Sequence, residues 1–177
     1  MTEQQEASED AVMTRIGQAV ILLHAGDREE ARNRLGEIWS EIGEEGDSLH
    51  RCTLAHYLAD AQDDPADELA WDLRALTAAE RPAEGPAEGT AAEARRGGPD
   101  QAVRVFYPSL HLSLAADYVK LRRPEAARVH LARARAATGA LGDDGYGNGV
   151  RAAIARLERR LAAEPGEEPR PFPEQHP

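Results

Sequence analysis

The sequence of 177 residues contains one cysteine, few aromatic residues and no long apolar run. A lone cysteine, Cys52, excludes a disulfide framework and fits a reducing compartment. Aromatic residues make up only 5%, and the abundance of alanine, leucine and arginine favours helices over a sheet. No apolar run approaches the roughly 18 residues of a membrane helix, and the acidic first ten residues do not resemble a signal peptide. We therefore expect a soluble, cytoplasmic protein.

Basic residues are also in short supply, with 21 against 32 acidic residues and a net charge of -11. Because phosphate backbones need a basic footprint, this balance argues against nucleic acid as a partner. The charge is uneven, with 18 acidic against 6 basic residues up to position 79 and 6 against 11 between positions 100 and 163. Such asymmetry would suit a head-to-tail contact with another copy of the chain, although a solvated surface is the simpler interpretation.

What the chain does contain is a recurring turn that opens a helix, first seen at residues 25–32. Gly26 suits the left-handed conformation that ends one helix, and Asp27 can accept hydrogen bonds from the first turn of the next. An apolar stripe at helical spacing follows on Ala31, Leu35, Ile38 and Trp39. The pattern predicts a pair of antiparallel helices.

The same periodicity along the chain predicts seven helices in a single domain over residues 10–163. Their approximate limits are 10–23, 28–42, 48–61, 65–79, 101–121 or 107–121, 124–140 and 150–163. The prolines and glycines of residues 80–99 predict a flexible insertion, and residues 1–9 and the proline-rich tail 164–177 are expected to be disordered.

Three prolines and a glycine-rich stretch help to place the helix ends. Pro65 and Pro124 are expected at the first position of a helix, where the missing N–H costs nothing. Pro108 should either start the fifth helix or kink it. The glycines of residues 142–149 predict a loop before the last helix.

Superposing the helix pairs reveals an internal repeat. Ala31, Leu69 and Ala127 are equivalent at a step of 38 residues once the insertion is removed. Two further equivalent sets follow the same register: Leu35, Leu73 and Leu131, and Ile38, Leu76 and Ala134. This register places Leu69, Leu73 and Leu76 on the inner stripe of the fourth helix.

The third helix pair carries a resemblance to the tetratricopeptide repeat family. Its large and small residues fall where that family has them, namely Leu114, Ala115 and Tyr118, then Ala127, Leu131 and Ala134. The second pair departs from the pattern, because Leu69 and His56 stand where the family has small residues. The resemblance implies an all-α fold, a right-handed stack of three antiparallel helical hairpins that forms a TPR-like α-solenoid, with a C-terminal capping helix.

The one cluster of metal-like residues lies on the third predicted helix. Cys52 and His56 are four residues apart, as zinc ligands on a helix are, but His50 lies on another face and no second pair supplies the remaining ligands. Cys52, His56 and Asp60 could imitate a nucleophile with its base, yet neighbours along one helix leave no cleft for a substrate. A buried thiol is the simpler interpretation.

Two further stretches also fall short of a site. Asp60, Asp63 and Asp64 lack the alternating ligand spacing of a calcium loop, and the glycines of residues 142–149 lack the strand and the Gly-Lys-Ser/Thr ending of a phosphate loop. Trp39 and Trp71 are expected in the core. We therefore expect no metal, no cofactor and no catalytic residue.

The resemblance implies that the first helix of each hairpin lines a concave face. The residues expected to contact a partner there are His50, Thr53, Tyr57, Asp60, Leu112, Ala116 and Lys120. Such a mixed surface could receive an extended peptide or a helix, unless these residues simply pack against one another.

The expected function is thus a non-catalytic scaffold for protein–protein interaction, with a protein or peptide partner or another copy of the chain. Two alternatives stay open. One is an effector-binding regulatory domain or a partner of a transcription regulator. The other, less favoured, is an enzyme that uses the helix from His50 to Asp60.

Overall fold

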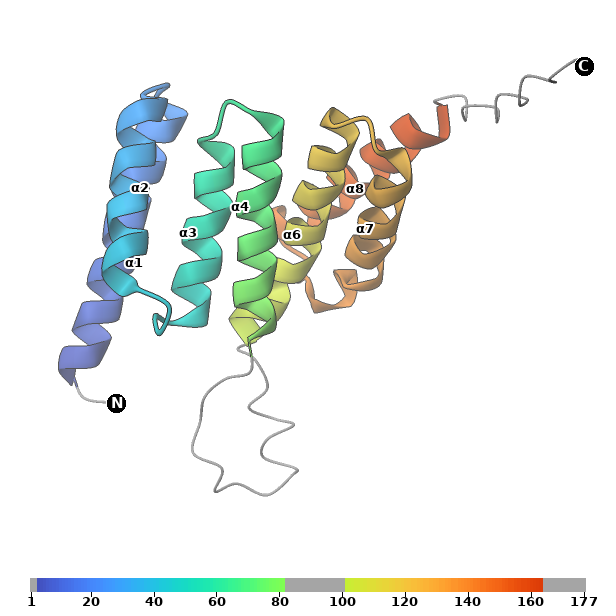
Figure 1. Cartoon of the computed structure of the whole chain (residues 1–177). Coiled ribbons are helices and arrows are strands. Elements are labelled where there is room, and N and C mark those ends of the chain that lie inside the picture. The colour runs from blue at the N-terminus through green and yellow to red at the C-terminus, as the bar shows by residue number, and fades with distance from the viewer. Residues whose placement is uncertain (1–2, 82–100, 164–177) are drawn as a thin grey trace, which may run out of the picture.

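The computed structural model describes residues 3–81 and 101–163, and in these ranges the chain is helical without a strand. The helices, shown in Figure 1, are α1 (Glu3–His24), α2 (Arg28–Ile42), α3 (Ser48–Asp60), α4 (Pro65–Glu80), α6 (Gln101–Lys120), α7 (Pro124–Ala136), the short 3-10 helix η1 (Thr138–Ala140) and α8 (Gly145–Ala163). The prediction of an all-helical fold is confirmed. None of these helices combines the length and the apolar character that crossing a membrane requires.

Helices that follow one another in the chain also pack against one another. The pairs α1 with α2, α3 with α4, and α6 with α7 each run antiparallel, and α2 contacts α3 as α4 contacts α6. Figure 1 shows these helices side by side in one row, with α8 packed on α6 and α7 at the C-terminal end. Each helix pair therefore meets the next through a direct contact.

Aspartates at the helix starts explain why the elements begin where they do. Asp27, Asp47 and Asp64 each accept backbone hydrogen bonds from the first turn of α2, α3 and α4. Gly26 adopts a positive φ of 93° between α1 and α2, which confirms the predicted turn. Local chemistry thus sets these boundaries.

The prolines lie partly as predicted. Pro65 and Pro124 begin α4 and α7, where a proline is tolerated because the first N–H of a helix has no partner. Pro108 does not start α6, because that helix runs unbroken through it from Gln101. Buried contacts of the surrounding helix outweigh the hydrogen bond that the proline cannot make.

Two helices begin earlier than the sequence indicates. α1 starts at Glu3 rather than near residue 10, since this polar stretch is rich in good helix formers. α8 starts at Gly145, inside the predicted loop 142–149, and Asp144 accepts a hydrogen bond of 2.7 Å from the N–H of Gly147. Glycine is required at position 147 because an added Cβ would collide with the carbonyl oxygen of Gly142.

The core is made of aliphatic side chains between neighbouring helices. One cluster joins α1, α2 and α3 through Ile16, Leu35 and Leu54, and another joins α6, α7 and α8 through Leu131 and Ile154. Fully buried alanines at positions such as 19, 31, 115 and 127 let the helices approach closely. The core therefore extends along the whole row.

The predicted inner stripe of α4 is wrong. Leu73 is 39% exposed, whereas Asp72 and Ala75 are buried together with Ala78 and Ala79. The 38-residue register does hold between α2 and α7, whose equivalent residues are all buried: Ala31, Leu35 and Ile38, and Ala127, Leu131 and Ala134. It fails for α4 because this helix buries a carboxylate, which an apolar periodicity assigns to the surface.

The predicted insertion at residues 80–99 and the tail at residues 164–177 lie outside the described residues, apart from positions 80 and 81. Their predicted flexibility stays a prediction.

Candidate functional site

The residues predicted to contact a partner lie on α3 and α6, and the structure divides them into two groups. His50 and Thr53 are buried, at 7% and 5% exposure, so these two side chains do not form a contact surface. The remaining five keep some accessibility: Tyr57, Leu112 and Ala116 are half-buried, and Asp60 and Lys120 are exposed. Their role in binding stays a prediction.

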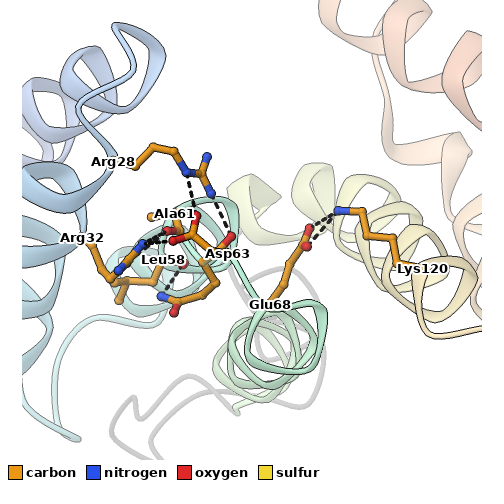
Figure 2. Close-up of polar contacts among 8 residues, drawn as sticks. Arg28, Arg32, Leu58, Ala61, Asp63, Glu68 and Lys120 are labelled. Atoms are coloured by element: carbon orange, nitrogen blue, oxygen red, sulfur yellow. Dashed lines mark hydrogen bonds and ion pairs between the residues drawn. The ribbon is translucent and has the colours of Figure 1, made fainter.

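Charged side chains along the edge of the row that holds the α1–α2 and α3–α4 turns connect neighbouring helix pairs, as Figure 2 shows. The Nζ atom of Lys120 on α6 lies 2.7 and 2.8 Å from the carboxylate oxygens of Glu68 on α4. Arg28 and Arg32 of α2 reach Asp63 in the turn after α3, at 3.1 and 3.0 Å. Lys120 is therefore already engaged by another helix of its own chain.

Between α3, α4 and α6 lies a buried polar cluster made of His56, Glu68, Asp72 and Asp117. The Nδ1 atom of His56 is 3.1 Å from a carboxylate oxygen of Asp72, which is only 2% exposed. Burial alone would lower the pKa of His56, but the hydrogen bond and charge of Asp72 raise it above its usual value. The Asp72 carboxylate therefore favours the protonated form of His56.

Asp117 is the most unusual member of this cluster, at 1% exposure and with its Oδ2 atom unpaired among the described residues. Burial and the neighbouring carboxylates of Asp72 and Glu68 raise the pKa of Asp117 far above its usual range. The Asp117 carboxyl therefore carries a proton at neutral pH and acts as a hydrogen-bond donor in a group of acids.

This cluster offers neither a metal site nor an obvious reaction centre. In the ranges that the structure describes, no three His, Cys, Asp or Glu side chains are arranged to hold a metal ion. Cys52 is fully buried, and burial together with the charge of Asp72 raises the pKa of its thiol to about 12. A thiol that stays protonated is a poor nucleophile.

A concave feature lies elsewhere, between α2, α3 and α4. An open pocket of about 760 Å³ lies there, bounded by the end of α2, the turn that follows it, the start of α3 and the end of α4. Its lining includes three arginines, Arg51, Arg74 and Arg81, together with Trp39 and the exposed Glu44 and Glu45. We call this feature the arginine pocket.

Two tryptophans hold two of these arginines in place. Trp39 and Trp71 meet edge to face, with ring centroids 5.3 Å apart and planes at 85°. The guanidinium of Arg51 lies 4.1 Å from the centre of the Trp39 ring, and that of Arg74 lies 4.4 Å from the centre of the Trp71 ring. Such cation–π contacts order guanidinium groups that would otherwise move freely.

The electrostatics of the arginine pocket favour an anion. Burial and the positive charge of Arg81 lower the pKa of Arg51, although its guanidinium stays charged. Arg51 and Arg81 donate to the carbonyl oxygens of Gly43 and Glu44, which aims both side chains at the same turn. Arg74 has the Trp71 ring as its one contact among those found in the described part of the chain.

Sequence reasoning missed this pocket. Both tryptophans pack against the core clusters, as the sequence predicts, but they are only half-buried. A signal was present, because three of the seven basic residues in the first 81 positions gather here. That signal becomes visible only when α2, α3 and α4 are in place.

Comparison of the chain with family models, with curated proteins and with solved structures found no match. Function is therefore inferred from the geometry of the chain itself.

Proposed function

We propose that the protein is a non-catalytic helical scaffold of tetratricopeptide-like architecture, with three hairpins in a right-handed stack and α8 as the cap, that binds a protein partner. The row of antiparallel helix pairs supports this architecture, as does the shared register of α2 and α7. The observation that carries the function is the open arginine pocket, with its ordered arginines and accessible indole ring.

Residue chemistry favours a protein partner for this pocket. Tryptophan and arginine are the residue types most enriched at the energetic centres of protein interfaces. Trp39 lines the pocket with part of its ring while the rest packs on the core, so it offers a rigid contact. The Arg51 guanidinium is ordered by its contact with the Trp39 ring, which reduces the side-chain entropy lost when a partner binds.

The test uses a pocket-filling variant that keeps every arginine. Ser40 lines the pocket and is exposed, so Ser40→Phe should block it without disturbing the core. The tagged chain would be incubated with an extract of the cells that express it, and bound proteins would be identified and then purified for calorimetry. We expect one partner to bind the native chain and to lose at least tenfold in affinity, about 1.4 kcal/mol, with Ser40→Phe.

Two comparisons make the result decisive. Arg156→Ala changes an exposed arginine on α8 and should bind the partner like the native chain. Tyr57→Ala would reveal whether α3 and α6 form the contact surface instead. A partner that ignores Ser40→Phe, or no partner that binds as a purified protein, would contradict the proposal.

A further inference from the structure

We infer that the arginine pocket recognises a phosphoryl group presented by the partner. The inference rests on the proposed function in one respect, namely that the partner is a protein. It adds the chemical group of that protein that enters the pocket. Its basis is the gathering of Arg51, Arg74 and Arg81 around one opening.

Three guanidinium groups exceed what a single carboxylate needs. Elsewhere in this chain one carboxylate engages one or two arginines: Arg135 alone donates to Glu158 with two bonds of 3.0 and 2.7 Å, and Asp63 accepts from two arginines of α2. A phosphoryl group carries nearly two negative charges and three acceptor oxygens at neutral pH. It can therefore take donors from several arginines at once, where a carboxylate would leave some unused.

The arginines of the pocket are poorly neutralised by the protein itself. Glu45 lies 3.8 Å from Arg81, but its side chain is mostly exposed and can swing away. Arg74 has no carboxylate partner among the ion pairs of the described ranges. Since Arg51 and Arg74 are each held by an indole ring, the positive charge is in place before a ligand arrives.

The rest of the surface limits the ligand to a compact anion. The net charge is -11, and the exposed Glu44 and Glu45 line the pocket beside the arginines. An extended polyanion such as nucleic acid would be repelled by the acidic surface around the pocket, whereas a single phosphoryl group can contact the arginines while the exposed glutamate side chains turn towards solvent. The positive charge is thus local and matches one group on a protein partner.

Both tryptophans of the chain touch these arginines, so intrinsic fluorescence reports directly on the pocket. The full-length chain would be titrated with inorganic phosphate, with N-acetyl-phosphoserine amide and with N-acetyl-glutamate amide. We expect saturable changes with both phosphoryl probes and at least tenfold weaker binding of the glutamate probe. Tighter binding of the phosphoserine probe than of inorganic phosphate would identify a protein-borne group, and the reverse would overturn that part of the inference.

Variants separate recognition from general charge effects. Arg74→Ala should weaken binding of the phosphoserine probe about tenfold. Arg74→Lys keeps the positive charge but loses the planar guanidinium with its paired donors, so its affinity should lie between those of the native chain and Arg74→Ala. Arg156→Ala should bind as the native chain does, and Glu45→Gln should bind more tightly because it removes a competing negative charge. Circular dichroism and thermal melts would show that each variant is folded.

The outcomes also distinguish this inference from the proposed function. Equal binding of the phosphoserine and glutamate probes, or no effect of Arg74→Ala in a folded variant, would overturn the phosphoryl inference. If Ser40→Phe still abolished partner binding in that case, the scaffold function would stand. Conversely, binding of the phosphoryl probes without any protein partner would contradict the scaffold function, whereas the inference that the pocket binds a phosphoryl group would stand.

Discussion

Asp117 brings a carboxyl group into the contact between α4 and α6, where two further acids, Asp72 and Glu68, lie nearby. Three negative charges in this space would repel one another strongly, since burial removes the water that screens them. A proton held by Asp117 converts one repulsion into a hydrogen bond. The cost is a dependence of folding on pH.

That dependence predicts the behaviour of Asp117→Asn. The pKa of Asp117 is higher in the folded chain than in the unfolded chain, so the folded state binds more protons and its stability falls as pH rises from about 4 through neutral values. The contribution is at most about 1.4 kcal/mol for each pH unit. Asparagine keeps a donor without a charge, so urea denaturation at pH 6, 7 and 8 should show a clearly shallower decline for the variant.

His56 adds a slope of the same sign, because its pKa is raised and the stabilising charge of its protonated form is lost as pH rises through the folded pKa. The variant should therefore keep a residual decline with pH. Identical declines in the native chain and in Asp117→Asn would contradict the assignment of the proton to Asp117.

The ion pair of His56 and Asp72 makes a second prediction. His56→Ala would leave the Asp72 carboxylate buried without its histidine, and losing one partner of a buried pair typically costs about 3 kcal/mol or more. The double variant His56→Leu with Asp72→Leu removes both polar groups and should cost clearly less than the two single changes combined. Denaturant titrations of all three variants measure this coupling, with the exposed His24→Ala as control.

A stack of aromatic rings between α6 and α7 gives a pH dependence of stability opposite in sign to that of Asp117 and His56. His111 and His130 lie with their Nδ1 atoms 3.1 Å apart, between the rings of Tyr107 and Tyr118. Burial, His130 and Arg133 lower the pKa of His111 to about 4. Because the folded state resists protonation here, it loses stability as pH falls from about 6.5 towards 4, and proton NMR should show His111 neutral at pH 5.5.

At the scale of the elements, the start of α8 depends on one glycine. Gly147 is buried, and an added Cβ would meet the carbonyl oxygen of Gly142. Gly147→Ala should therefore lower the free energy of unfolding by about 1 to 3 kcal/mol. Gly149, in the same helix, has open space around it, so Gly149→Ala should raise stability by up to about 1 kcal/mol. A loss of stability with Gly149→Ala would show that helix propensity does not determine stability at the N-terminal end of α8.

The positions of the helices could be predicted from the sequence far better than the identity of the buried residues of α4. Caps such as Asp27 and Asp64 act on residues two or three positions away, so their effect is visible locally. The buried face of α4 depends on partners from other helices: His56 lies within hydrogen-bond distance of Asp72, and a protonated Asp117 adds no second negative charge beside it. The hydrophobic periodicity of α4 alone predicts that Asp72 is exposed, because the pattern contains no information about residues on other helices.

For the whole molecule, the contacts between helix pairs decide how well the row holds together. Arg32 of α2 donates to the carbonyl oxygen of Ala61 and to Asp63, across the junction between the first two helix pairs. Arg34 on the same helix pairs with Glu30, one turn away, and with no other described residue. Arg32→Ala should thus cost about 1 to 2 kcal/mol, and Arg34→Ala less than about 0.5 kcal/mol. Equal costs in chemical denaturation would mean that this junction adds nothing to stability.

The number of long helices in the described ranges, most of their limits and the apolar stripes of α2 and α7 could be predicted from the sequence alone, because capping and 3.6-residue periodicity act over a few neighbouring residues. Only the tertiary structure decided that Asp72 is buried, that His50 is not a surface residue and that three arginines share one pocket. The residues of the arginine pocket lie between positions 39 and 81 on three helices. Their proximity arises from helix packing, which no local pattern of residues encodes.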